Sequence, residues 1–101
     1  MTSDTEKLDP RALSDAARLF EALAHPVRLR IVCGLVNEGC CVGDLTACLG
    51  LPQAFVSRHL AILREAGVVA VEADGRRRVY RVIHPLIPSL VSLLCARGAP
   101  A

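Results

Sequence analysis

The sequence predicts a mainly α-helical (α+β) fold with one β-hairpin, in the order ααααββα. Apolar residues recur at helical spacing, Pro and Gly mark the ends of the helical segments, and β-branched residues surround one Asp-Gly pair. The 101 residues fit one compact domain, which buries only a modest share of its surface. We therefore expect a single domain that needs a partner. The expected segments are a flexible N-terminus at 1–9, the folded domain at 10–97 and a C-terminal tail at 98–101.

The first two predicted helices each begin at a proline. Residues 10–24 open with Pro10, and a second helix over residues 26–37 opens with Pro26, after the first has been broken. Both segments carry apolar side chains at helical spacing, which predicts that one face of each helix is buried. Their apolar positions are Leu13, Ala16, Ala17, Phe20, Leu23 and Ala24 in the first, and Val27, Ile31 and Leu35 in the second.

Two further helices joined by a short turn predict a helix-turn-helix. A short helix within residues 42–51 is stopped by Gly50, and Pro52 begins a longer helix over residues 52–67. The longer helix has an apolar face and an opposite polar face, so the polar face is available to a partner. The expected buried residues are Val42, Leu45, Leu49, Val56, Leu60 and Leu63, and the polar ones are Gln53, Ser57, Arg58 and Arg64.

The last third of the chain predicts a hairpin and a buried helix. Two β-branched segments around Asp74-Gly75 predict a hairpin over residues 68–82, with three arginines at or just past its tip. The final helix, within residues 85–98, is apolar almost all round from Leu86 to Leu94, and such a helix must be buried. In so short a chain we expect a second copy of the protein to cover it.

Composition excludes several classes of protein. No run approaches the ~18 consecutive apolar residues of a membrane span, and residues 1–9 lack the features of a signal peptide, so we expect a cytoplasmic protein without membrane contact. Five cysteines, an odd number, do not fit a disulfide framework in that compartment. No Cys-x-x-Cys accompanies a βαβ pattern, so a thiol oxidoreductase is not favoured. We expect neither an enzyme nor a cofactor.

Charge is distributed unevenly along the chain. Residues 1–52 carry five basic and seven acidic side chains, whereas residues 53–84 carry six basic and three acidic ones. A basic region on a nearly neutral body is typical of a nucleic-acid binder. On a helix in the major groove, Gln pairs with adenine and Arg with guanine, and hairpin arginines suit phosphates or a minor groove. The candidate DNA-binding residues are Gln53, Ser57, Arg58, His59, Arg64, Arg76, Arg77 and Arg78.

Each of these features alone is equally typical of a solvated surface, but their order along the chain resembles a known family. The segments "LFEALAHPVRLRIVCGL", "CVGDLTACLGLPQAFVSRHLAILREAGVV" and "ADGRRRVYRV" resemble the ArsR/SmtB family of winged-helix bacterial repressors over roughly residues 17–83. The resemblance implies a winged helix-turn-helix and a homodimer joined through the first and last helices. It also implies binding to an inverted-repeat operator until an inducer releases the protein, with DNA contacts on residues 53–64 and the wing.

The family senses metals, metalloids, oxidants or reactive sulfur, so the resemblance leaves the inducer open. One family metal site, on the last helix, corresponds here to Val82, His84, Cys95 and Gly98, which lacks two of the four ligands. No zinc or nickel site is therefore favoured, and His84 is expected to be a capping or surface residue.

The family's metalloid motif, Cys-Val-Cys-Asp-Leu, corresponds to residues 41–45, where Gly43 replaces the second Cys. A thiophilic metalloid such as arsenite prefers about three thiolates, so this alternative would use Cys33, Cys40 and Cys41.

A reversible thiol switch at Cys40 and Cys41 is the favoured hypothesis. Adjacent Cα atoms lie about 3.8 Å apart, shorter than the ~4.4–6.8 Å usual for disulfides, so a vicinal bond would be strained and easily reversed. Cys41 is expected to be exposed at a helix start. A second candidate pair, Cys33 and Cys95, resembles the cysteines of the family's reactive-sulfur sensors, although Cys33 fits a core position equally well. Cys48 is expected in the core.

A protein of another class fits the same segments. In a winged-helix protein-interaction module, the arginines of the hairpin would contact an acidic protein in place of DNA. Affinity for operator DNA that falls steeply with salt would distinguish the repressor from this module.

Overall fold

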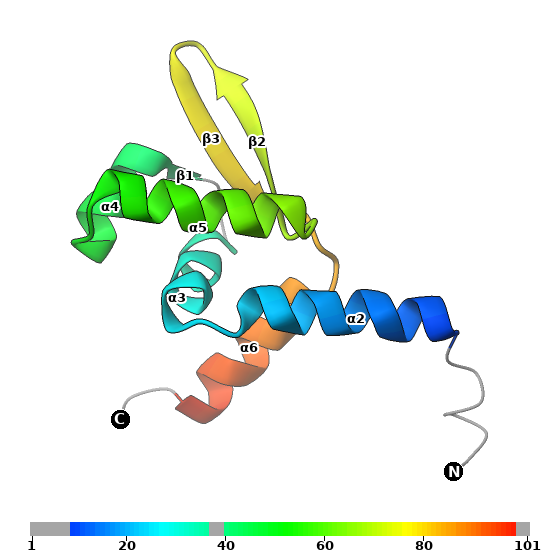
Figure 1. The fold of residues 1–101 in the computed structure, drawn as a ribbon. Helices are drawn as coiled ribbons and strands as arrows, with labels where there is room; N and C mark the ends of the chain where they lie inside the picture. Colours follow the sequence, from blue (N-terminus) through cyan, green and yellow to red (C-terminus); the bar gives the residue numbers. More distant parts are fainter. Residues whose placement is uncertain (1–8, 37–39, 99–101) are drawn as a thin grey trace.

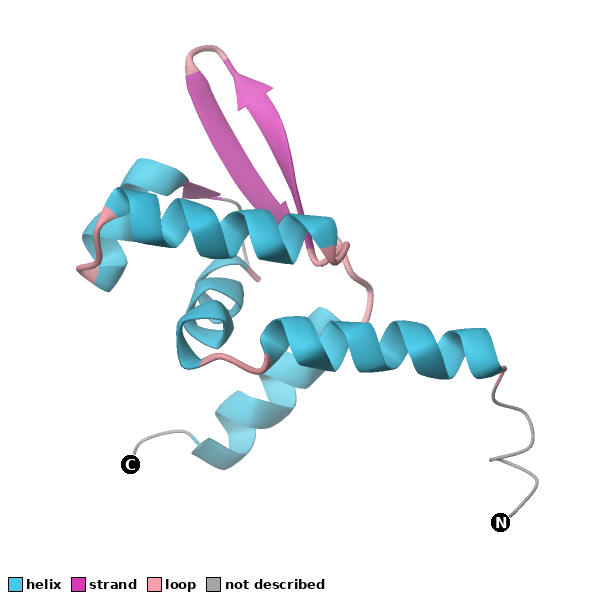
Figure 2. Cartoon of the chain, in the orientation of Figure 1, coloured by secondary structure: helices cyan, strands magenta, loops and turns pink. Residues whose placement is uncertain are grey.

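A computed structural model of the chain describes residues 9–36 and 40–98, with the backbone alone at 40, 41 and 95–98. The described part contains five helices and three strands (Figure 1, Figure 2). The predicted order ααααββα is confirmed, with one short strand added. The predicted segments 1–9 and 98–101 lie almost wholly outside the described residues. The elements are α2 (Pro10–Leu23), α3 (Pro26–Leu35), β1 (Cys40–Cys41), α4 (Val42–Leu49), α5 (Gln53–Glu65), β2 (Val69–Asp74), β3 (Arg77–Val82) and α6 (Ile87–Gly98).

Side chains cap the first two helices at the prolines that the sequence singled out. The Asp9 carboxylate accepts a hydrogen bond from the backbone N–H two residues on, at 3.0 Å, and Pro10 has no N–H to satisfy. His25 does the same for α3, because its Nδ1 accepts a hydrogen bond from the Val27 N–H at 3.1 Å. Both predicted helix starts are confirmed.

The hairpin is formed by β2 and β3, which pair antiparallel from Val69↔Val82 at the base to Asp74↔Arg77 near the tip. Gly75 is the first residue of the two-residue turn Gly75-Arg76 and has φ +66°, a position and conformation that favour Gly; Asp74 belongs to β2, so the turn lies one residue later than the Asp-Gly signal predicts. The hairpin projects away from the helices (Figure 1). We call it the wing.

The strand β1 was not predicted. Cys40 pairs with Tyr80 and Cys41 with Val79, so β1 extends the sheet in the order β1-β3-β2 and β3 is its central strand. Two residues are too few to show the alternation by which a strand is recognised from sequence. The backbone of the cysteine pair is therefore part of the sheet, where the sequence predicted a loop leading into a helix.

The core lies where α2, α3, α5 and the start of α6 meet the base of the sheet. Its members are apolar residues almost fully removed from solvent. The predicted apolar positions of α3, α4 and α5 are buried or packed against this core, whereas of those predicted for the first helix only Leu23 is buried, and Leu13, Ala17, Phe20 and Ala24 are exposed. The core is Leu19, Ala22, Leu23, Ile31, Val32, Leu35, Leu45, Val56, Leu60, Leu63, Val68, Val69, Ile87 and Val91.

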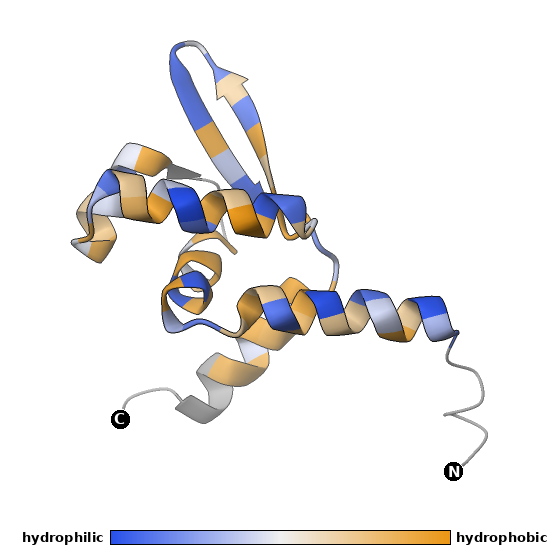
Figure 3. Cartoon of the chain, viewed as in Figure 1, coloured by the Kyte–Doolittle hydropathy of each residue, from blue (hydrophilic) through white to orange (hydrophobic). Residues whose placement is uncertain are grey.

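A second set of apolar side chains is exposed on α2 and α6. Phe20 on α2 is 56% exposed, and Leu93 and Leu94 on α6 are 64% and 51% exposed. Among the described side chains of α6, the expected burial is thus met within the chain only at Ile87 and Val91. Figure 3 shows that much of the described part of α6 is hydrophobic.

Candidate nucleic-acid interface

The helices α4 and α5 form the predicted helix-turn-helix. At the end of α4, the Gly50 N–H donates to the Thr46 carbonyl oxygen at 2.8 Å, and Gly50 adopts φ +68°, which lets the chain reverse. Pro52 then precedes α5. The two helices pack on each other, with Leu45 of α4 only 4% exposed. This packing holds α5 in a fixed orientation to the rest of the domain.

The two faces of α5 separate as the sequence predicts. The apolar positions of the inner face, namely Val56, Leu60 and Leu63, are fully buried. On the outer face, Gln53, Arg58 and Arg64 are exposed and Ser57 is half-buried. Hydrophilic and hydrophobic bands accordingly alternate along α5 (Figure 3). The helix presents hydrogen-bond donors and positive charge to solvent along its length.

A cleft separates α5 from β3. Arg58 and Arg64 reach it from α5, and the half-buried Tyr80 reaches it from β3. Guanidinium and hydroxyl donors are the groups that proteins use to contact phosphates. Tyr80 was not among the predicted site residues, because a single Tyr in a β-branched segment indicates packing, and only the fold brings it opposite the arginines of α5. The other lining residues are Ala61, Ile62 and Glu65.

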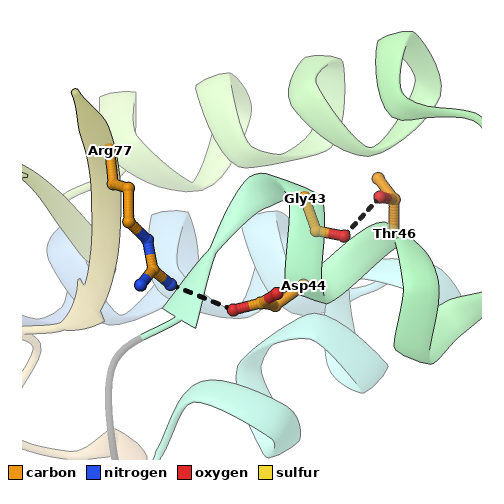
Figure 4. Close-up of polar contacts among 4 residues, drawn as sticks. All are labelled: Gly43, Asp44, Thr46 and Arg77. Carbon is orange, nitrogen blue, oxygen red and sulfur yellow. Dashed lines mark hydrogen bonds and ion pairs between the residues drawn. The ribbon is translucent and has the colours of Figure 1, made fainter.

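The wing presents Arg76, Arg77 and Arg78, all exposed. Nη2 of Arg77 lies 3.1 Å from Oδ2 of Asp44 in α4, so this arginine connects the wing to the helix-turn-helix (Figure 4). Both side chains are exposed, and such pairs contribute only about 0–1 kcal/mol, so this contact adds little to the stability of the fold. Sequence analysis did not identify Asp44, because it lies 33 positions from its partner.

Residues 25–71 match the family model described as bacterial regulatory protein, arsR family. The chain is 34% identical over 100 residues to the biofilm growth-associated repressor of Xylella fastidiosa, and the match covers 95% of this chain and 87% of that protein. The chain belongs to the ArsR family. It is also 49% identical over 74 residues to the HTH-type transcriptional repressor SmtB of Mycobacterium tuberculosis, covering 72% of this chain and 55% of SmtB. The chain thus matches about half the length of that ArsR-family relative.

Solved structures of regulators have the same fold. The transcriptional repressor BigR from Xylella fastidiosa superimposes with a TM-score of 0.85 at 31% sequence identity, covering 100% of this chain and 99% of BigR. HlyU from Vibrio cholerae gives a TM-score of 0.85 at 28% identity, covering 91% of this chain and 100% of HlyU. The predicted winged helix-turn-helix and the resemblance to the ArsR family are confirmed.

His59 departs from its predicted place on this ArsR-family surface. We expected it to contact the DNA backbone from the border of the buried face, but it is only 7% exposed. Its ring lies 4.5 Å from the ring of His25 and 4.7 Å edge-on from that of Phe55, measured between centroids. The assignment of His59 to the DNA-binding set is therefore corrected, because its side chain points into the domain.

Burial also affects the hydrogen bonding of His59 and of Arg28, whose positive charge faces it. Within the described residues, neither Nδ1 of His59 nor Nε of Arg28 has a hydrogen-bond partner. Loss of solvation lowers the pKa of His59, and the positive charges that face it, on His25 and Arg28 of the α2–α3 region and on Arg58 of its own helix, lower the pKa further. The neutral ring is thus the form that the fold accommodates.

The thiols are distributed over several elements. Cys33 of α3 is half-buried against the core, as one of the two sequence interpretations expects. Cys48 of α4 is exposed, so its predicted core position is wrong, because α4 is short and turns only Leu45 fully inward. The side chains of Cys40, Cys41 and Cys95 lie outside the described part of the structure.

No group of three His, Cys, Asp or Glu side chains that could hold a metal ion occurs among the described residues. His84 instead acts as a capping residue, as predicted. Its Nδ1 accepts a hydrogen bond from the Leu86 N–H at 3.2 Å just before α6.

No helix in the described ranges combines the length and the apolar character required to cross a membrane.

The lowered pKa of His59 predicts that acid destabilises the fold. The unfolded chain takes up a proton at this ring near pH 6.5, before the folded chain does, so the free energy of unfolding should decrease as the pH falls below about 6.5. Urea titrations between pH 8 and pH 5 measure this decrease. It should be smaller in His59→Phe than in the parent. A His59→Phe curve parallel to that of the parent would contradict the assignment.

Proposed function

We propose that this protein is a homodimeric transcriptional repressor that binds an inverted-repeat operator in double-stranded DNA and releases it when cysteine thiols are modified. The observation that supports DNA binding most strongly is the basic surface formed by α5 and the wing. Exposed arginines occupy both elements, although the net charge of the chain is only +2. The ArsR-family relatives SmtB and the biofilm growth-associated protein are named as repressors.

The proposed division of roles follows exposure. Gln53 and Arg58 are exposed on α5 and carry the amide and guanidinium groups that read adenine and guanine in the major groove. Ser57, half-buried, and Arg64, at the far end of α5, contact phosphates. The wing arginines lie along an adjacent phosphate run or enter a minor groove.

A second copy of the chain covers the exposed apolar side chains of α2 and α6 in this proposal. These side chains line one apolar groove instead of being scattered singly over the surface. Pairing through the groove would give two copies of α5, as an inverted repeat requires. The groove is lined by Phe20, Leu23, Ala24, Leu29, Leu90, Leu93 and Leu94.

The favoured inducer site is the Cys40–Cys41 pair. Its backbone pairs with Tyr80 and Val79 of β3, so any change in the peptide between the cysteines is transmitted to the wing. In a vicinal disulfide the Cα atoms are held closer than ordinary disulfides allow, and ring closure would force this peptide out of its extended conformation. With peroxide as oxidant, the sulfur–sulfur bond forms and both thiol hydrogens leave in water. The expected result is loss of the β1–β3 pairing.

Two alternatives for the inducer remain in the proposal. Cys33 lies in α3 and Cys95 in α6, two helices that contact each other, so this pair could react with an oxidant or reactive sulfur. One solved structure with a TM-score of 0.83 to this chain is that of reduced HlyU from Vibrio cholerae, so a redox state is named for a protein of the same fold. Arsenite bound by Cys33, Cys40 and Cys41 is the other alternative.

For DNA recognition, we predict that Arg58→Ala weakens binding to the operator by about 1–3 kcal/mol and binding to random DNA much less. Arg76→Ala should weaken binding to operator and to random DNA, and it should reduce the slope of log K against log salt by about one. Arg76 is chosen because Arg77 is paired with Asp44. Fluorescence anisotropy over a salt series measures both. Salt-insensitive or absent DNA binding would instead favour the protein-interaction module.

For dimerisation, we predict that Leu93→Glu gives a folded monomer. Its side chain is 64% exposed in the single chain, whereas a carboxylate buried at an apolar interface should weaken dimerisation at least about tenfold. Sedimentation equilibrium measures the effect. Ile62→Glu, at an exposed apolar position of α5, is the matched control and should remain dimeric. A dimeric Leu93→Glu variant would exclude α6 from the interface.

For induction, we predict that peroxide or polysulfide lowers the operator affinity of the parent but not of Cys41→Ser. Cys48→Ser should respond like the parent to these oxidants. The measurement is operator binding before and after treatment, followed by mass spectrometry of the thiols. A response to arsenite that requires Cys33 would support the metalloid alternative, and a parental response of Cys41→Ser to all three reagents would refute the sensor assignment.

A further inference from the structure

A hollow between α3 and α4 is lined by none of the residues assigned above to the basic surface. It measures about 420 Å³, within the ~300–1,000 Å³ typical of small-molecule sites. Most of its lining is apolar, with two thiols and one cation, which is the composition expected of a site for an apolar ligand with few polar contacts. The lining residues are Leu29, Arg30, Cys33, Gly34, Leu45, Cys48 and Leu49.

The two thiols approach this hollow from different helices. Cys48 belongs to the last turn of α4 and is exposed, whereas Cys33 belongs to α3 and is half-buried. Arg30, exposed and one turn before Cys33, adds a positive charge. The helices are close here, since a Cβ on Gly34 would lie 4.0 Å from Leu45 Cδ2. A molecule in the hollow would therefore contact both helices at once.

We propose that this hollow is a modification site for an apolar α,β-unsaturated carbonyl compound that carries a carboxylate. Leu29, Leu45 and Leu49 would contact its apolar part, and Arg30 its carboxylate. The Cys48 thiol adds to the β-carbon: a carbon–sulfur bond forms, the carbon–carbon π bond breaks, and the thiol hydrogen ends on the α-carbon. No oxidant is consumed. Of the two thiols that line the hollow, Cys48 is exposed and Cys33 only half-exposed, so Cys48 reacts before Cys33.

The adduct has a consequence for DNA binding that rests on the proposed function. α4 is the first helix of the helix-turn-helix, and its Asp44 contacts Arg77 of the wing. A group bonded to Cys48 and seated against α3 changes the packing of α4, and with it the positions of α5 and the wing. Addition at Cys48 should therefore lower operator affinity.

The test uses trans-3-benzoylacrylate, which combines an aromatic ring, an enone and a carboxylate. Intact-protein mass spectrometry gives the rate of addition as a function of reagent concentration, and peptide mapping identifies the cysteine. We expect one adduct at Cys48, with a rate that saturates because binding precedes addition. The apparent affinity of the protein for the reagent, taken from the concentration at which the rate is half-maximal, should fall about two- to five-fold in Arg30→Gln. Arg11→Gln, at an exposed arginine of α2, is the matched control and should behave like the parent.

The neutral methyl ester of the reagent provides a second control, because it should not distinguish Arg30→Gln from the parent. Addition that is faster at another cysteine than at Cys48, a rate that rises linearly without saturation, or equal rates in Arg30→Gln and the parent would overturn the proposed site.

The kinetics are measured without DNA, so they do not depend on the proposed function. Absence of operator binding by the unmodified protein would contradict the repressor and leave the site intact. A protein modified at Cys48 that binds operator as tightly as the parent would refute the regulatory consequence.

Discussion

Burial of the inner face of α5 is the constraint on which the rest of the structure depends. Val56, Leu60 and Leu63 are fully buried. Replacing a buried Leu by Ala usually lowers the free energy of unfolding by about 2–5 kcal/mol. The helix therefore cannot rotate about its axis without exposing this face. Because its orientation is fixed, the direction in which Gln53 and Arg58 project is fixed as well. The packing of the core thus determines the chemistry of the outer surface.

The sequence predicted helices and the hairpin well because their signals are local. Proline starts, glycine stops and the spacing of apolar residues are all present within a few positions of the element that they specify. The features that it missed depend on distant parts of the chain. β1 exists only because β3 lies beside it, Asp44 is near Arg77 only in the folded chain, and Tyr80 lines a cleft that the fold creates.

His59 and Cys48 show why a position on a helix does not by itself determine burial. His59 was placed near the border of the apolar face of α5, but the histidine at the start of α3 packs on it and closes that border. Cys48 was placed with the apolar residues of α4, but the helix has only eight residues and does not bury its last turn fully. Both outcomes depend on neighbouring elements whose positions the sequence does not specify.

The central place of β3 in the sheet means that the wing is not an independent module. In an isolated hairpin, each strand has one edge without a hydrogen-bonded neighbour. Here the edge of β3 that faces away from β2 is partly paired with β1, the two residues that precede α4. Exchanging the wing for that of another regulator would thus disturb the pairing of β3 with β1, a strand of only two residues. Insertions that lengthen the hairpin tip, beyond Asp74 and Arg77, avoid this edge, so evolutionary variation in wing length is expected there and not at the base.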